Sequence, residues 1–126
     1  MRKIGIDYGS KRVGIALTDE AGLMAFPHVV LENNQSLLKE VIKIIEENEV
    51  SEMVIGYSLG RDGQPNEIHK AVESFMTDIT LERPIPIHLE PEQYTTQEAI
   101  RFQGRNKDTD ASAAAIILNS FITRKK

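Results

Sequence analysis

Short segments in which apolar residues run together or alternate with polar ones are typical of β-strands. Five segments of this kind predict strands at residues 3–8, 12–19, 24–31, 53–57 and 85–89. The turn Gly9-Ser10-Lys11 is short enough to join the first two strands as a hairpin. Pro86 cannot donate a hydrogen bond to a neighbouring strand, so we expect the last strand at an edge of the sheet.

Apolar residues at helical spacing predict helices in the intervals between and after the later strands. The two clearest core stripes are Leu37, Leu38, Val41, Ile42 and Ile45, and then Ile68, Val72, Phe75 and Ile79. Asn33 or Asn34 can cap the first helix, and Pro65 suits the first turn of the second. Two further helices are expected near 95–103 and 109–123.

The order of these elements predicts an α/β fold. Three strands in a meander, followed by right-handed crossovers through helices, give a mixed five-stranded sheet flanked by helices. The first strand is then central and lies beside the strand at 53–57. This is the ribonuclease H-like architecture, and a chain of 126 residues is expected to form it as one domain, 1–126.

Composition excludes several classes of protein and site. There is no cysteine, which excludes disulfides and thiolate metal sites. No apolar run approaches the length that spans a bilayer, and Met1 leads directly into a strand, so we expect a cytoplasmic protein without membrane contact. No stripe of surplus apolar residues stands out, so the pattern does not determine the oligomeric state. We expect a monomer or a weak dimer.

Charge is distributed unevenly along the chain. The formal net charge is −4, yet residues 1–12 carry +3 and residues 101–126 carry +4. If the two ends meet in space, they form a basic surface on an acidic body. Solubility is the better explanation for the last three basic residues, 124–126.

Three acidic residues stand where element ends should converge. Asp7 interrupts the apolar pattern of the central strand, Glu92 follows the edge strand, and Asp110 lies in the first turn of the last helix. A buried, unpaired carboxylate costs several kcal/mol, so Asp7 needs a cation, hydrogen-bond donors or a metal. Clustered carboxylates suit Mg²⁺ or Mn²⁺. Two such ions about 4 Å apart can activate water and stabilise the leaving oxygen in phosphodiester hydrolysis.

Each acidic residue also has a purely structural explanation. Asp7 could shape a tight turn with Gly9, Glu92 could be a solvated loop residue, and Asp110 could favour the helix dipole. Asp108 is a competing candidate two residues before Asp110. It is the joint placement of the three acids in one architecture that favours a site.

Four segments resemble, in order, the signature blocks of the YqgF (RuvX-like) family. They are DYGSKRVGIALTD at 7–19, VIGYSLGRDGQ at 54–64, EPEQYTTQEA at 90–99 and DASAAAIIL at 110–118. Members are described as Holliday junction resolvases and as pre-16S rRNA nucleases. The resemblance implies a ribonuclease H-like fold and a Mg²⁺- or Mn²⁺-dependent nuclease acting on branched DNA or on the rRNA precursor. It also implies that Asp7, Glu92 and Asp110 are the catalytic, metal-binding residues.

The chain departs from this family pattern in two blocks. The third block usually reads Asp-Glu-Arg, whereas here it reads Pro91-Glu92-Gln93, and the second usually reads Gly-Leu-Pro, whereas here it reads Gly56-Tyr57-Ser58. Glutamine cannot supply the charged, bidentate fork of arginine, which would weaken phosphate binding. A non-catalytic nucleic-acid-binding or ribosome-assembly protein therefore stays open as the alternative. The first block also resembles the phosphate loop of actin-like sugar kinases, which need a second such domain.

Basic residues near the acids predict contacts with structured RNA or branched DNA. Lys11 and Arg12 follow Asp7, and three more basic residues precede Asp110, so both groups would contact phosphates if they line one groove. The latter three are Arg101, Arg105 and Lys107. A solvated helix face explains Arg101 and Arg105 equally well. Thr95 fits a capping box with Glu98, and the family resemblance adds a phosphate contact at that helix N-terminus.

Overall fold

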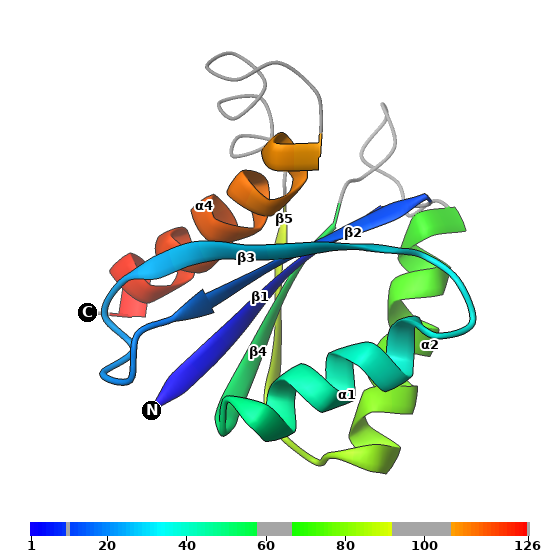
Figure 1. Ribbon diagram of the computed structural model, residues 1–126, viewed down its shortest axis with the longest axis horizontal. Coiled ribbons are helices and arrows are strands. Elements are labelled where there is room, and N and C mark those ends of the chain that lie inside the picture. Colours follow the sequence, from blue (N-terminus) through cyan, green and yellow to red (C-terminus); the bar gives the residue numbers. More distant parts are fainter. Residues whose placement is uncertain (10, 58–66, 92–106, 126) are drawn as a thin grey trace.

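The computed structural model describes residues 1–9, 11–57, 67–91 and 107–125 (Figure 1). Its elements are β1 (Arg2–Tyr8), β2 (Arg12–Thr18), β3 (Ala25–Glu32), α1 (Leu37–Glu47), β4 (Val50–Tyr57), α2 (Glu67–Glu82), β5 (Ile87–Pro91) and α4 (Lys107–Lys125). The helix predicted near 95–103 and Pro65 lie outside these residues. Within the described ranges, no helix is both long and apolar enough to cross a membrane.

The strands form the predicted five-stranded mixed sheet, in the order β3-β2-β1-β4-β5. β1 pairs antiparallel with β2 and parallel with β4, so it is central as predicted. β2 pairs antiparallel with β3, and β4 pairs parallel with β5. β5 is an edge strand, as Pro86 predicted, but it begins at Ile87 rather than at residue 85.

Helices cover both faces of the sheet (Figure 1). Ile4, Ile6 and Tyr8 of β1 belong to the core that the sheet shares with α1 and α2. The predicted stripe positions Val72, Phe75 and Ile79 of α2 are buried in the same core. The opposite face packs against α4, whose buried residues share a second core with residues of β2, β3 and β4. The residues of this second core are Ala16, Ala25, Val54, Ala114, Ala115, Ile117, Leu118, Phe121 and Ile122.

Small residues let α4 approach the sheet closely. A Cβ atom added to Gly5 would lie 2.9 Å from the carbonyl oxygen of Ala114 and 2.9 Å from Cβ of Leu118. The side chain of Asn119 fixes the helix to the start of β3, because its Oδ1 accepts a hydrogen bond of 3.0 Å from the backbone N–H of Ala25. The distance between α4 and the sheet is thus set by a glycine.

The predicted capping of α1 by Asn33 or Asn34 is wrong. Ser36 occupies the N-cap position, in a helical conformation and without a side-chain capping bond. Oδ1 of Asn34 accepts a hydrogen bond of 2.9 Å from the N–H of Ser36, outside the helix. Asn33 instead donates from Nδ2 to the carbonyl oxygen of Gly9, 2.8 Å away. The side chain of Asn33 thus contacts the first hairpin. Local sequence does not reveal this contact.

The loop between β2 and β3 is held by Asp19. Its Oδ1 accepts a hydrogen bond of 2.9 Å from the N–H of Leu23. This bond stabilises the carboxylate and lowers the pKa of Asp19. The stabilisation is present at neutral pH and is lost as the pH falls through that lowered pKa. Asp19 lies at the far end of β2 from Arg12, and so away from Asp7.

Candidate active site

Asp7 lies on the α4 side of the central strand. Successive side chains of a strand point to opposite faces, so Asp7 shares the face of Gly5, against which Ala114 and Leu118 pack. Its registered neighbours are Gly14 on β2 and Gly56 on β4. Neither neighbour has a side chain, so the half-buried carboxylate of Asp7 is not crowded from the two adjacent strands. The predicted placement of Asp7 within a central strand is confirmed.

A second carboxylate, Glu90, occupies the same row of the sheet. Gly56 is registered with both Asp7 on one side and Glu90 on the other. Glu90 shares the face of His88, whose ring centroid is 4.7 Å from that of Phe121 in α4. Sequence reasoning missed Glu90 because it ended this strand at residue 89. The available signal was that residues 90 and 92, two apart, fall on one face if the strand continues.

Of the other two predicted acids, the structure describes only the backbone of Asp110. Glu92 lies outside the described residues. Asp110 lies in the first turn of α4, with its side chain outside the described part. Asn119 contacts Ala25 at the start of β3, and Ala114 packs on Gly5, so the N-terminal turns of α4 are directed toward the end of the sheet that carries Asp7. Among the side chains that the structure describes, no three acids or histidines gather into a metal-binding group.

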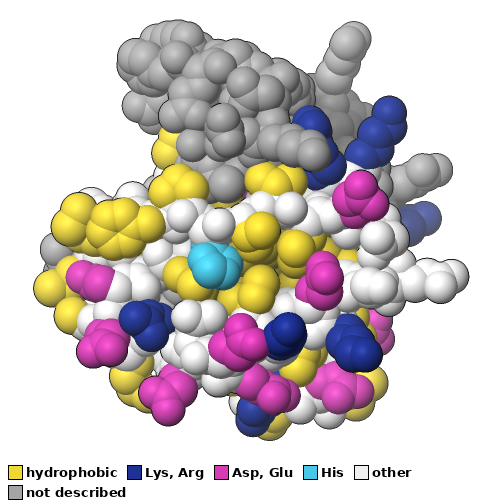
Figure 2. All heavy atoms as spheres, in the orientation of Figure 1, with side chains coloured by type: hydrophobic (Ala, Val, Ile, Leu, Met, Phe, Trp, Pro, Cys, Tyr) yellow, Lys and Arg dark blue, Asp and Glu magenta, His cyan; other side chains and the backbone are white. Residues whose placement is uncertain are grey.

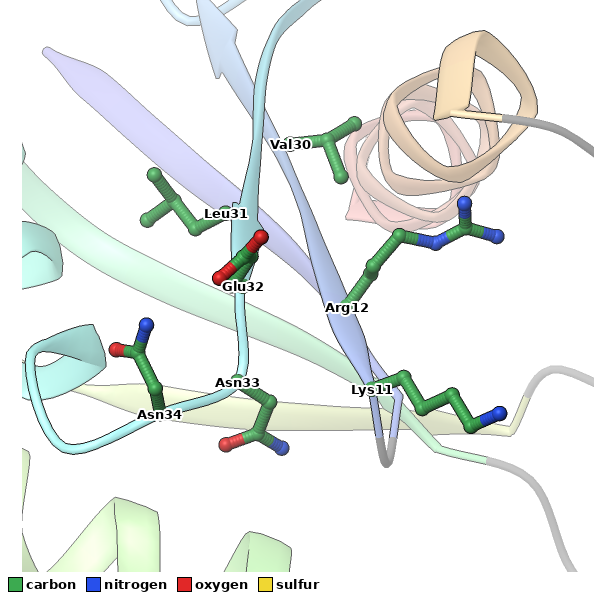
Figure 3. A pocket seen from close by; sticks show the side chains of 7 residues that line it. All are labelled: Lys11, Arg12, Val30, Leu31, Glu32, Asn33 and Asn34. Carbon is green, nitrogen blue, oxygen red and sulfur yellow. The ribbon is translucent and has the colours of Figure 1, made fainter.

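Arg12 is the first residue of β2, and Lys11 precedes it in the turn of the first hairpin. They line a pocket of about 440 Å³ together with residues 30–34 (Figure 3). Arg12 alternates with Gly14 and Ala16, which places it on the α4 side of the sheet, and Figure 3 shows its side chain extending to that side. Arg12 therefore shares the face of Asp7, and Lys11 is exposed in the adjoining turn; their predicted phosphate contacts stay a prediction.

The remaining predicted nucleic-acid contacts fall outside the part of the chain that the structure describes. They are Thr95, Arg101 and Arg105, and the side chain of Lys107. On the face drawn in Figure 2, Lys and Arg side chains lie at the upper right, whereas acidic side chains are most frequent along the lower part, among further basic ones. The basic surface predicted from the two ends of the chain stays a prediction, because residues 101–106 lie outside the described ranges.

The turn that carries these cations is tightly constrained. A Cβ atom added to Gly9 would lie 2.5 Å from the carbonyl oxygen of Arg12, too close for any other residue. Asn33 holds the same turn from β3: Nδ2 donates to the oxygen of Gly9, and its backbone N–H donates to the oxygen of Lys11 at 2.9 Å. Asn33 is therefore a positioning residue for the hairpin. Sequence reasoning had instead proposed it as a helix cap.

Replacing Asn33 is expected to loosen this turn. Asn33→Ala removes the hydrogen bond to Gly9, which should lower the free energy of unfolding by about 1 kcal/mol. It should also weaken nucleic-acid binding, because the turn that carries Lys11 would lose its side-chain hydrogen bond at Gly9. Urea unfolding and a binding titration measure the two effects, with Asn34→Ala as the control that leaves the turn intact. Unchanged binding by Asn33→Ala would contradict a positioning role.

Comparison with family models and curated proteins assigns the chain to a family. The family model for RuvX, described as Holliday junction resolvase, matches residues 1–124. The chain belongs to the RuvX family. A curated relative named "Putative pre-16S rRNA nuclease" in Oleidesulfovibrio alaskensis is 33% identical over 132 residues, covering 97% of this chain and 92% of the relative. A relative of the same name in Maridesulfovibrio salexigens is 32% identical over 134 residues, covering 98% and 99%.

Solved structures show the fold of this RuvX protein. RuvC of T. thermophilus, in complex with a Holliday junction substrate, is similar with a TM-score of 0.66 and 14% sequence identity. The match covers 99% of this chain and 96% of RuvC. Both the ribonuclease H-like fold and the family resemblance inferred from the sequence are thereby confirmed.

Proposed function

We propose that this RuvX protein is a metal-dependent nuclease that hydrolyses phosphodiester bonds in structured nucleic acid. The observation that carries the proposal is the placement of Asp7: a half-buried carboxylate on the central strand, between two glycines and on the side of α4. The relatives that match the chain over nearly its whole length are named for pre-16S rRNA. The 5′ end of that precursor is therefore the first substrate to test, and the Holliday junction is the second.

The donor chemistry around Asp7 fits a hard divalent cation. The chain has no cysteine, and the side chain across Gly56 from Asp7 is a second carboxylate, Glu90. Carboxylate oxygens suit Mg²⁺ or Mn²⁺. Asp7, with Glu92 and Asp110, would hold the ions. When bound, such ions make the attacking water more acidic and stabilise the charge on the leaving oxygen.

The chain's own residues then bind and orient the substrate. Arg12 supplies positive charge on the face of Asp7 and can hold a phosphate through its planar fork, and Lys11 adds charge in the adjoining turn. Gly14 and Gly56 leave the sheet surface beside Asp7 without side chains, so a phosphate group can approach it. Asn33 and Gly9 keep the cationic turn at a fixed position relative to Asp7.

A cleavage assay with the purified protein tests this function. End-labelled four-way DNA junction and a 16S rRNA precursor with its 5′ extension are incubated with Mg²⁺, with Mn²⁺ and with EDTA. We expect cleavage of at least one of the two in either metal and none in EDTA. Binding of both substrates without cleavage in any metal would favour the alternative, a non-catalytic nucleic-acid-binding or ribosome-assembly protein.

Neutralising the hairpin cations is expected to weaken binding in a salt-dependent way. Lys11→Gln and Arg12→Gln should each reduce the slope of log affinity against log salt concentration by about 1, because each loses one phosphate contact. The measurement is a binding titration at several salt concentrations. Lys43→Gln is the matched control, since Lys43 is exposed on α1, which packs on the opposite face of the sheet. Variants that keep the wild-type slope would show that the hairpin does not contact phosphates.

A further inference from the structure

Four exposed apolar side chains gather at one corner of the sheet, at the end of β1 and β2 that lies away from Asp7. Their exposed fractions lie between 50% and 78%, and they are Met1, Leu23, Met24 and Phe26. Gly22 brings the β2–β3 loop against the N-terminus, since a Cβ atom added to it would lie 2.7 Å from the carbonyl oxygen of Met1. Figure 2 shows apolar side chains at the left end, over the start of β3 and this loop, with acidic ones beside them. We call these four residues the N-terminal corner.

The corner is an uncovered part of the face that forms the larger core. Phe26 is registered with Leu17, which is buried in the core that the sheet shares with α1 and α2. Further along β3, Val29 and Leu31 pack against the same core and are partly buried. In Figure 1, α1 and α2 lie toward the other end of β3, so this face is bare at the start of the strand. A contiguous apolar group of this kind marks an interaction site, whereas apolar side chains scattered singly do not.

The loop holds two of these side chains in a fixed position. Oδ1 of Asp19 accepts hydrogen bonds from the N–H of Leu23 at 2.9 Å and from that of Met24 at 3.5 Å. The backbone of Asp19 closes the same loop, because its N–H donates to the carbonyl oxygen of Met24 at 3.0 Å. A surface that is already ordered loses little conformational entropy on binding, so it can bind a partner through a small area.

The size of the corner indicates the strength of the contact that it can make. Four large apolar side chains exposed to this degree present roughly 500 Å². A standard, stable interface buries about 800 Å² on each partner. Together with its polar border, the corner thus reaches the lower limit of specific interfaces, which predicts a reversible contact rather than a permanent one.

The border of the corner carries both signs of charge. Arg2 follows Met1 at the start of β1, and Glu20 is exposed in the β2–β3 loop. Within the described part of the chain, neither side chain makes an ion pair. In a two-fold contact, residue i of one protomer meets residue j of its partner and the reverse, so Arg2 can meet Glu20 at two symmetric places. A border with one cation and one anion is therefore complementary to itself.

β3 is poorly suited to continue the sheet into a partner, although it is an edge strand. Pro27 has no N–H to donate, and the register between β2 and β3 shifts beside it. Both features protect an edge strand from pairing with another chain. A contact at this corner is therefore made by the apolar face and not by an added strand.

We propose that the N-terminal corner is the contact surface of a weak, two-fold symmetric homodimer of this RuvX protein. Leu23, Met24 and Phe26 of the two protomers pack on one another, and Arg2 of each protomer faces Glu20 of the other. Asp7 lies toward the opposite end of β1, so both candidate active sites stay accessible and are directed away from the contact. The inference does not depend on the proposed nuclease function.

Sedimentation velocity of the full chain tests this contact. We expect the weight-average mass of wild type to rise toward that of a dimer between about 10 μM and about 1 mM protein. Leu23→Glu places a charge in the apolar surface and should raise the Kd of the dimer by about tenfold or more. Leu81→Glu is the matched control, because Leu81 is exposed on α2, outside the corner, and its variant should keep the wild-type Kd.

Exchanging charges tests the pairing across the two-fold axis. Glu20→Arg places like charges opposite each other at two symmetric positions and should raise the Kd by about threefold or more. Combining it with Arg2→Glu restores opposite charges and should return the Kd toward the wild-type value. These variants leave the apolar residues intact, so they decide the question if Leu23→Glu fails to fold.

Three results would overturn the proposal. A wild type that stays monomeric at the highest concentration would assign the corner to a different partner. An unchanged Kd for Leu23→Glu, or an equal rise for Leu81→Glu, would place any association elsewhere on the surface. A doubly exchanged variant that associates no better than Glu20→Arg would exclude the two-fold pairing of Arg2 with Glu20.

Discussion

Asp7→Asn is expected to abolish cleavage, by a factor of about a thousand or more, which corresponds to roughly 4 kcal/mol of lost transition-state stabilisation. Asparagine keeps the size of the side chain and removes the charge that a divalent cation needs. The metal-free protein should be as stable as wild type or more stable, because Asp7 shares its row with the buried acid Glu90. The rise in melting temperature caused by Mn²⁺ in wild type should be reduced or absent in the variant.

Thermal melts with and without Mn²⁺, paired with the cleavage assay, measure these effects together. Asp78→Asn is the matched control, because Asp78 is exposed on α2, on the other side of the sheet. A structural role for Asp7 gives the reverse result: Asn lowers the melting temperature of the metal-free protein, and Mn²⁺ has no effect on either form. The two roles are thus separated even before activity is measured.

Gly5→Val is expected to be strongly destabilising, because it would push α4 away from the sheet. Even the first added carbon would lie 2.9 Å from the backbone oxygen of Ala114, which cannot rotate away. Overpacking of this kind costs about 1–3 kcal/mol for Gly5→Ala, more than the roughly 0.5–1 kcal/mol that alanine gains over glycine within a strand. Valine adds two more carbons and should lower the free energy of unfolding by about 3 kcal/mol or more.

Urea unfolding of wild type, Gly5→Ala and Gly5→Val measures this graded loss. Because α4 also carries Asp110, cleavage by the folded Gly5→Ala protein should fall even at temperatures where it stays native. A Gly5→Ala variant that is more stable than wild type, with full activity, would show that α4 does not depend on the close approach.

The local patterns of the chain were sufficient for the order and type of the described elements. Alternation in β1 and β2, the short turn between them, and the apolar stripes of α1 and α2 each reflect a periodicity that burial imposes on neighbouring residues. The predicted ends of the strands were less accurate. β4 extends back to Val50, and β5 extends forward to Pro91, because pairing with an adjacent strand adds backbone hydrogen bonds that side-chain pattern does not reveal.

The error at α1 has a related cause. Asparagine before an apolar stripe is a good capping signal, but Asn33 has a competing acceptor in the carbonyl oxygen of Gly9, 24 residues earlier. Only the tertiary structure brings β3 beside the first hairpin and makes this acceptor available. The helix then begins at Ser36 without a side-chain cap, since burial of Leu37, Val41 and Ile45 is sufficient to stabilise it.

By itself the sequence determined that an acid interrupts the central strand and that cations follow it. Those features depend on side-chain chemistry and on short-range spacing, both of which can be read along one segment. Tertiary structure alone decided that Glu90, 83 positions from Asp7 along the chain, lies in the same row across Gly56. The physical reason is register: a shift of one residue turns a side chain to the opposite face, and pairing across three strands fixes that register.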